Sequence, residues 1–203
     1  MKGWVWVAAA AAGTMAFVAY KSSRGAYETA EYELLEAEGD FEIRAYPDLV
    51  LVSAPRTSSS LRDGSSFTKL FRYISGDNAA GEKIAMTTPV FMSEESGGGK
   101  MSFVVPKQVA LTGAPRSLEP EVELETMQRG SYAAVRFSGD LGPQAVERQT
   151  ARLRSWIQGR GLSVDGPRLV AGYDPPFTPP FLRRNEVLLP VRRAEAPAAT
   201  TQS

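Results

Sequence analysis

Two cations and a phenol lie close together on a predicted helix, and their spacing could serve ligand binding. Lys69, Arg72 and Tyr73 fall within about one turn of the helix predicted at 65–74. Such a group could anchor a ligand carboxylate through charge-assisted hydrogen bonds. The same arrangement is also typical of a helix face in contact with solvent, so both interpretations stay open.

A second cationic pair, Arg183 and Arg184, stands directly before Asn185 and Glu186. These guanidinium groups could pair with an acidic neighbour or face an anionic ligand, and the first use is the more general one. Upstream of them, residues 175–180 hold four prolines, with Phe177 between the two pairs. Proline donates no amide hydrogen bond, which predicts a stiff segment outside the sheet. This segment could wall an apolar pocket or form a strap over the sheet.

The chain contains no histidine and no cysteine. It therefore lacks the usual general base, the commonest metal ligand, the usual axial ligand of haem iron and every thiolate site. The candidate carboxylates Glu42, Glu123 and Glu125 lie on predicted strands, where alternation places them toward solvent. We find no paired catalytic residues, and the sequence predicts a protein that is not an enzyme. An enzyme that uses a carboxylate of raised pKa is the alternative.

Length and charge set the broad class. With 203 residues, 43% of them hydrophobic, the chain can build one domain and leave residues over at its ends. Lysine plus arginine and aspartate plus glutamate each number 23, so the formal net charge is zero. No overall electrostatic field would attract the protein to nucleic acid, and the sequence predicts no such partner.

Both ends are predicted to lie outside the domain, which spans 27–193. Residues 3–20 carry no charge and are rich in alanine, and they predict a membrane anchor or signal segment over 1–26. Apolar residues continue past the small-residue run at 11–13, which favours an uncleaved anchor. The predicted location is membrane-anchored or periplasmic, with the membrane as a partner. Residues 194–203, rich in Ala, Thr and Pro, predict a disordered tail.

The run 81–92 predicts a strand that bends in its middle. Ile84, Met86 and Val90 fall on one side of an extended chain. Pro89 has no amide to donate, so the strand must lie at an edge or change partners there.

Each half of the chain is predicted to follow the order strand, strand, helix, strand, strand. The helices are 65–74, with an apolar face at Phe67, Leu70, Phe71 and Ile74, and 142–158. The predicted strands are 32–36, 41–46, 49–53, 81–92, 101–106, 122–127, 131–137, 168–171 and 186–191. The pairs 32–46 and 122–137 are interpreted as equivalent meanders, and 107–120 as a connection. The predicted fold class is α+β, a duplicated unit forming a distorted antiparallel β-barrel with two helices and a cleft between the halves.

Several stretches, in this order, resemble the SOUL haem-binding protein family. They are Tyr32-Glu-Leu-Leu-Glu36, Phe41-Glu-Ile-Arg-Ala-Tyr46, Phe71-Arg-Tyr-Ile-Ser-Gly76, Lys83-Ile-Ala-Met-Thr-Thr-Pro-Val90, Gly172-Tyr-Asp-Pro-Pro-Phe177 and Phe181-Leu-Arg-Arg-Asn-Glu-Val187. The resemblance covers about 31–191 and implies a fold similar to the effector-binding domains of multidrug-sensing regulators. It also implies that haem or a related tetrapyrrole binds in an apolar cleft beside the first helix. No DNA-binding segment accompanies it, so a regulator function is not implied.

The absence of histidine changes what this resemblance implies for the iron. Tyr73, Met86 or Lys69 could ligate iron, or the porphyrin could bind without strong axial ligation. We favour the second mode, in which the flat apolar ring packs on the protein and basic side chains meet the propionates. The candidate binding residues are Phe67, Lys69, Leu70, Phe71, Arg72, Tyr73, Met86, Phe177 and Arg183. The predicted function is that of a carrier or buffer of haem, and another amphipathic small molecule is the alternative ligand.

Overall fold

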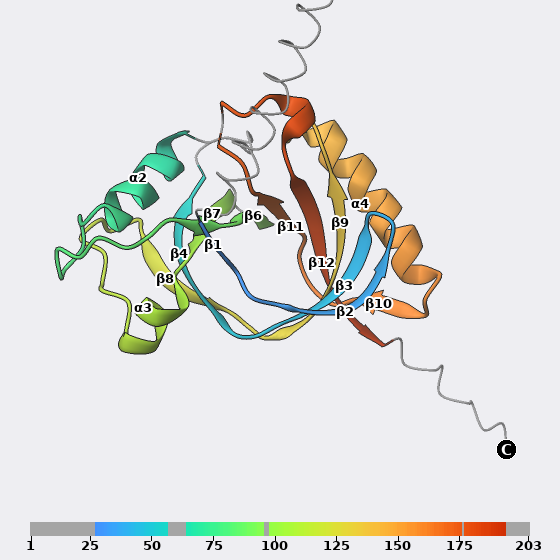
Figure 1. Cartoon of the computed structure of the whole chain (residues 1–203), viewed down its shortest axis with the longest axis horizontal. Coiled ribbons are helices and arrows are strands. Elements are labelled where there is room, and N and C mark those ends of the chain that lie inside the picture. The colour runs from blue at the N-terminus through green and yellow to red at the C-terminus, as the bar shows by residue number, and fades with distance from the viewer. Residues whose placement is uncertain (1–26, 57–63, 96–97, 176, 194–203) are drawn as a thin grey trace, which may run out of the picture.

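The computed structural model describes residues 27–56, 64–95, 98–175 and 177–193. The fold is α+β, as predicted: a ten-stranded, strongly curved sheet carries helices on its outer side (Figure 1). The predicted N-terminal segment at 1–26 and the predicted tail at 194–203 lie outside the described residues, so the membrane or periplasmic location stays a prediction. Among the described helices, none combines the length and apolarity needed to cross a bilayer.

The strands in chain order are β1 (Glu28–Thr29), β2 (Glu33–Glu38), β3 (Phe41–Tyr46), β4 (Leu49–Pro55), β5 (Thr87–Thr88), β6 (Val90–Glu95), β7 (Gly98–Val104), β8 (Glu123–Met127), β9 (Gly130–Phe137), β10 (Leu162–Val164), β11 (Leu169–Gly172) and β12 (Asn185–Arg193). The helices are α2 (Gly64–Ile74), α3 (Lys107–Thr112) and α4 (Pro143–Gln158), with a single 3-10 turn η1 at Pro180–Leu182. The sequence analysis missed α3 and β10. Both are short, at 6 and 3 residues, and too brief to show a period.

The main sheet runs in the order β2, β3, β9, β12, β11, β6, β7, β4, β8, with β10 beside β12. Its centre lies between the antiparallel neighbours β11 and β6. The strands β11, β12, β9 and β3 on one side mirror β6, β7, β4 and β8 on the other, and β2 is an extra strand at one edge. Each half therefore has the predicted order of strand, strand, helix, strand, strand. The end strands β2 and β8 do not pair with one another, so the barrel expected from the sequence is an open, curved sheet.

One of the two predicted meanders is confirmed and the other is wrong: β2 and β3 pair as antiparallel neighbours, whereas β8 and β9 do not pair with each other. β3 pairs with β9 of the other half, and β4 pairs with β8, so the two halves exchange strands. The equivalent pairs are β3–β4 and β8–β9, while β2 is an additional edge strand. Alternation along a strand reports which side faces the core but not which neighbour it joins, and it therefore could not reveal this exchange.

The chain changes sheet partners at Pro89, as predicted. β5 ends at Thr88 and pairs in parallel with β1, whereas β6 begins at Val90 and pairs with β7 and β11. Residues 81–86 form no strand, which corrects the expected extent of this element. They fold back on α2 instead: the amide of Ile84 donates to the carbonyl of Ile74, and the buried Asn78 side chain bonds the backbone of Glu82.

Two apolar cores lie on the two faces of the sheet. The core on the outer face includes Leu70 of α2 and Leu153 of α4, and the core on the inner face contains no helical residue. Neighbouring residues of β4 divide between them: Leu51 faces the inner core and Val52 the outer one. The outer face is thus the one that the helices cover, and α2 and α4 lie over opposite ends of it (Figure 1).

Candidate functional site

Two aromatic side chains form a partly exposed surface on one flank of α2. Phe67 and Phe71 are 38% and 49% exposed, and their nearly parallel rings lie 6.1 Å apart. Their spacing of four residues places them one turn apart on the same side of the helix. The Phe67 ring also meets the edge of Phe103 on β7, with 5.3 Å between the ring centroids. The flank therefore faces the middle of the sheet and offers aromatic surface to a flat ligand.

The helix is rotated relative to the predicted orientation. Ser66, Leu70, Tyr73 and Ile74 are the buried residues of α2, so the expected inward pair Phe67 and Phe71 lies at the flank instead. Tyr73 is 1% exposed, and its hydroxyl donates to the carbonyl of Pro115 at 2.7 Å. The large aromatic body of Tyr73 fills the core position that the periodicity had given to phenylalanine.

The two predicted cations of α2 are both paired with acids. Lys69 Nζ lies 2.5 Å from Glu121, and Arg72 lies 2.6 Å from Asp77. At about 100° per residue, Arg72 projects about 100° away from Phe71, whereas Lys69 projects about 160° away from it, on the opposite flank. Arg72 is thus the cation of this pair that can approach a ligand on the aromatic flank.

Leu70 and Tyr73 are almost completely buried, and Met86 is half-buried against the outer core. Phe177 is 86% exposed in the loop before β12. The prediction that these residues contact a ligand is not tested by their contacts within the protein, and it stays a prediction.

Arg183 has the internal partners that one interpretation of the sequence expected. It is 7% exposed, with Nη1 donating to Asp140 at 2.5 Å and Nε to the carbonyl of Thr178 at 2.7 Å. Its neighbour Arg184 pairs with Glu186 at 2.7 Å. The first interpretation, pairing with an acidic neighbour, is therefore confirmed for both arginines.

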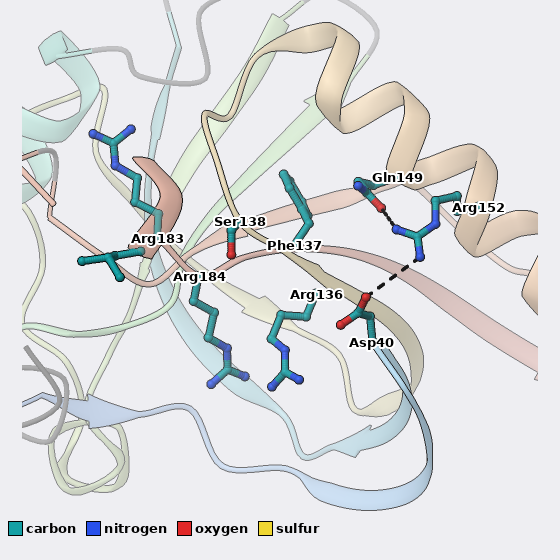
Figure 2. Close-up of a pocket in the computed structure, with 9 residues that line it drawn as sticks. Asp40, Arg136, Phe137, Ser138, Gln149, Arg152, Arg183 and Arg184 are labelled. Carbon is teal, nitrogen blue, oxygen red and sulfur yellow. Dashed lines mark hydrogen bonds and ion pairs between the residues drawn. The ribbon is translucent and has the colours of Figure 1, made fainter. Parts of the chain in front are cut away.

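A cavity of about 590 Å³ lies between α4, the turn before β3 and the loop before β12. Figure 2 shows the guanidinium groups of Arg136 and Arg184 pointing the same way, with that of Arg152 directed toward Asp40. The lining residues are Asp40, Arg136, Phe137, Ser138, Gln149, Arg152, Leu182, Arg183 and Arg184. Only two of these are apolar, so the cavity suits a small polar anion better than a flat apolar ring.

Most of the charge in this cavity is already balanced. Arg152 donates to Gln149 at 2.7 Å and lies 4.0 Å from Asp40, and Arg183 and Arg184 have the acidic partners described above. The side chain of Arg136 is exposed and has no hydrogen-bond or ion-pair partner among the described residues. One such arginine at the surface does not by itself indicate a ligand.

The sequence analysis missed a buried ion cluster on the inner face. Arg44 and Glu186 are 1% and 0% exposed and form two parallel hydrogen bonds of 2.6 and 2.9 Å. Arg44 Nε also donates to Glu42 at 2.6 Å, and the Tyr173 hydroxyl donates to Glu186 at 2.9 Å. With Arg184 as a further donor, both oxygens of Glu186 are occupied. One sequence feature could have indicated this cluster: Glu186 is the single acidic residue at the start of the otherwise apolar strand 186–191.

Charge and burial fix the protonation states in this cluster. Burial alone would raise the pKa of Glu186, but hydrogen bonds and charge from Arg44, and then from Arg184, lower it. Burial raises the pKa of Tyr46 to about 12 and that of Tyr173 well above its usual value. Glu186 therefore stays ionised and both phenols stay protonated near neutral pH, so the cluster has the properties of a structural ion pair.

Residues 27–190 match the SOUL heme-binding protein family. Heme-binding protein 2 of Homo sapiens is 32% identical to the chain over 169 residues, which cover 77% of this chain and 80% of that protein. Heme-binding protein 1 of Sus scrofa is 25% identical over 174 residues, which cover 82% of this chain and 87% of that protein.

Two solved structures show the same fold at low identity. The C-terminal domain of EcmrR superposes with a TM-score of 0.54 at 13% identity, over 80% of this chain and 99% of that one. A hydrolase from Listeria innocua superposes with a TM-score of 0.58 at 12% identity, over 78% of this chain and 94% of that one. The likeness confirms the predicted effector-binding type of fold, and at these identities it shows the fold alone.

Proposed function

The chain belongs to the SOUL heme-binding protein family, and we propose on this premise that it binds haem or a related tetrapyrrole without catalysing a reaction, as a carrier or buffer. The names of its relatives, heme-binding proteins 1 and 2, support the ligand class. The observation that carries the proposal in this chain is the partly exposed aromatic pair Phe67 and Phe71 on α2.

A porphyrin suits this aromatic flank for physical reasons. The ring is flat, and covering the exposed surface of two stacked phenylalanines would contribute about 25 cal/mol for each Å² of apolar area removed from water. Part of that gain is lost to the cost of association, so the expected affinity is modest. Arg72 is the nearer of the two α2 cations to the pair, and its long side chain could reach an anionic substituent at the edge of the ring.

The iron itself contributes little in this proposal. The chain offers no histidine, and Tyr73, one of the alternative ligands, is buried with its hydroxyl bonded to Pro115. Binding therefore rests on the ring and its carboxylates, which predicts that iron-free protoporphyrin binds about as well as haemin.

Titration of the full chain with haemin, and separately with iron-free protoporphyrin, tests the proposal through absorbance and tryptophan quenching. We expect saturable one-to-one binding of both, with dissociation constants within about tenfold of each other, a difference of about 1.4 kcal/mol. Binding of haemin alone would show that iron ligation dominates. If neither ligand binds more tightly than to an unrelated control protein, the tetrapyrrole proposal fails, and another amphipathic ligand becomes the working hypothesis.

A further inference from the structure

Arg56, directly after β4, is a buried cation with no counter-charge among the described residues. Its side chain is 8% exposed, and its Nε and Nη1 are shielded from solvent with no hydrogen-bond partner. No other described residue forms an ion pair with this guanidinium group. Burying an ionised group without a partner costs several kcal/mol, and such groups in folded proteins are normally paired. Arg56 is an exception to this rule among the described residues, and it is therefore a candidate for binding an anionic ligand group.

The sheet register places Arg56 in a polar row across the outer face. The amide of Arg56 donates to the carbonyl of Gly99, Gly99 stands opposite Glu94, and Arg168 precedes the pair Leu169–Ser93. Arg56, Gly99, Glu94 and Arg168 are therefore neighbours on four adjacent strands, and directly opposed residues project to the same face. The row holds two cations and one acid.

The one acid of the row is held by the other cation. Arg168 donates through Nη2 to Glu94, and its Nη1 bonds Glu147 and Thr150 of α4 at 2.7 and 3.0 Å. This arrangement orients Glu94 toward α4 and leaves Arg56, on the α2 side, without an acceptor. The charges at the Arg168 end of the row are thus paired, whereas Arg56 at the other end has no acidic partner among the described residues.

The glycine at position 99 makes room for the Arg56 guanidinium. A Cβ atom at Gly99 would lie 3.1 Å from both Cζ and Nε of Arg56, and 2.5 Å from the carbonyl oxygen of Ser93. The guanidinium group therefore occupies the space above β7 that a side chain would otherwise fill. Gly99 and Phe103 are four residues apart on β7 and therefore lie on the same face of the sheet. Phe103 is the residue whose ring contacts that of Phe67.

The first turn of α2 adds a favourable field at the same end of the sheet. The hydroxyl of Ser66 donates to the carbonyl of Pro55, so the first turn of α2 contacts the residue that precedes Arg56. The first turn of this 11-residue helix holds no acidic residue. The amino end of a helix favours anions, and in α2 the first turn contacts the residue before Arg56, although Asp63 directly precedes the helix in the sequence.

We propose that Arg56 binds a propionate carboxylate of the tetrapyrrole whose ring lies on Phe67 and Phe71. The inference rests on the proposed function and specifies the charged anchor of that site. Gly99 and Phe103 are about 13 Å apart along β7, at roughly 3.3 Å per residue, so a ring on the phenylalanines can extend its edge substituents toward the guanidinium group. Arg168 acts as a positioning residue because it keeps Glu94 away from Arg56.

Charge-selective binding to an Arg56→Gln variant tests this assignment. We expect iron-free protoporphyrin to bind the variant about 10- to 100-fold more weakly than the unaltered chain, as for loss of a charge-assisted hydrogen bond. Protoporphyrin dimethyl ester, which lacks the carboxylates, should bind both proteins equally. Arg56→Lys keeps the charge and should recover part of the affinity, and Arg154→Gln, an exposed arginine of α4, is the matched control.

The outcomes separate the two proposals. If the unaltered chain binds protoporphyrin and Arg56→Gln binds it equally well, the assignment of Arg56 is overturned while the proposed function stands. Equal losses for the acid and the ester would also overturn it, because they would indicate a general change in the site. If the unaltered chain binds neither porphyrin, the proposed function fails and the assignment fails with it. Urea unfolding of each variant confirms that the proteins compared are folded.

Discussion

Replacing Glu186 by alanine is expected to destabilise the protein by about 3–5 kcal/mol, because the change leaves a buried arginine without its counter-charge. Arg44 is 1% exposed and donates two of its hydrogen bonds to this carboxylate. The hydroxyl of Tyr173 loses its acceptor as well. The midpoint of urea unfolding, followed by tryptophan fluorescence, measures the loss.

Two further variants isolate the cause. Glu123→Ala removes an exposed glutamate from edge strand β8 and should change the free energy of unfolding by less than about 0.5 kcal/mol. The double variant Arg44→Met/Glu186→Leu replaces both charges by apolar groups and should be much more stable than Glu186→Ala. If Glu186→Ala unfolds at the same urea concentration as the unaltered protein, the Arg44–Glu186 ion pair does not stabilise the fold.

The Glu186 carboxylate also makes the stability of the protein depend on pH in the acid range. The pKa of Glu186 is lower in the folded chain than in the unfolded one, so the unfolded state binds protons more readily. Its contribution to stability is therefore fully present above the ordinary pKa of a glutamic acid. The contribution is lost as the pH falls through the lowered value. The stability difference between the unaltered chain and Glu186→Ala should shrink over that acid range.

Replacing Phe67 and Phe71 together by alanine is expected to weaken protoporphyrin binding by about 10- to 100-fold, or about 1.4–2.7 kcal/mol. Both rings are partly exposed and stacked, so a porphyrin would lose its largest apolar contact on α2. The decrease should be similar for protoporphyrin and its dimethyl ester, in contrast to Arg56→Gln, because the phenylalanines contact the ring rather than its carboxylates. Fluorescence titration with protoporphyrin and with its dimethyl ester measures the affinities of the unaltered chain, the phenylalanine variant and Arg56→Gln.

The double variant Leu34→Ala/Leu35→Ala is the matched control for lost apolar surface. These leucines are 53% and 51% exposed on edge strand β2, and their removal should leave porphyrin binding unchanged. If the leucine and phenylalanine variants lose the same affinity, porphyrin binding reflects general surface hydrophobicity and not a site on α2.

Local sequence patterns predicted the elements well. The two-residue alternation of β3 and the apolar periodicity of α4 correspond to observed elements, because each period reflects one covered face. The orientation of α2 was not accessible in the same way. Phe67 and Tyr73 compete for the core, and a helix with five large apolar or aromatic residues can bury several alternative stripes.

The candidate site was only partly predictable. The aromatic and cationic residues of α2 were visible because they are close in sequence. Arg44 and Glu186 are 142 positions apart and meet only through β9 and β12, so nothing local indicates their contact. Arg56 carried no sequence signal, since its isolation depends on where Arg168 directs Glu94. Such features follow from the strand register, which single-sequence patterns do not determine.

Hydrogen–deuterium exchange of the full chain, with and without iron-free protoporphyrin, most directly tests whether the porphyrin binds on the aromatic flank of α2. We predict increased protection of α2 and of the facing strand β7, which carries Phe103 against Phe67. Residues of α4 and of the arginine-lined cavity should exchange as they do without ligand. Protection confined to α4 and the loop before β12, with none on α2, would contradict the proposed site.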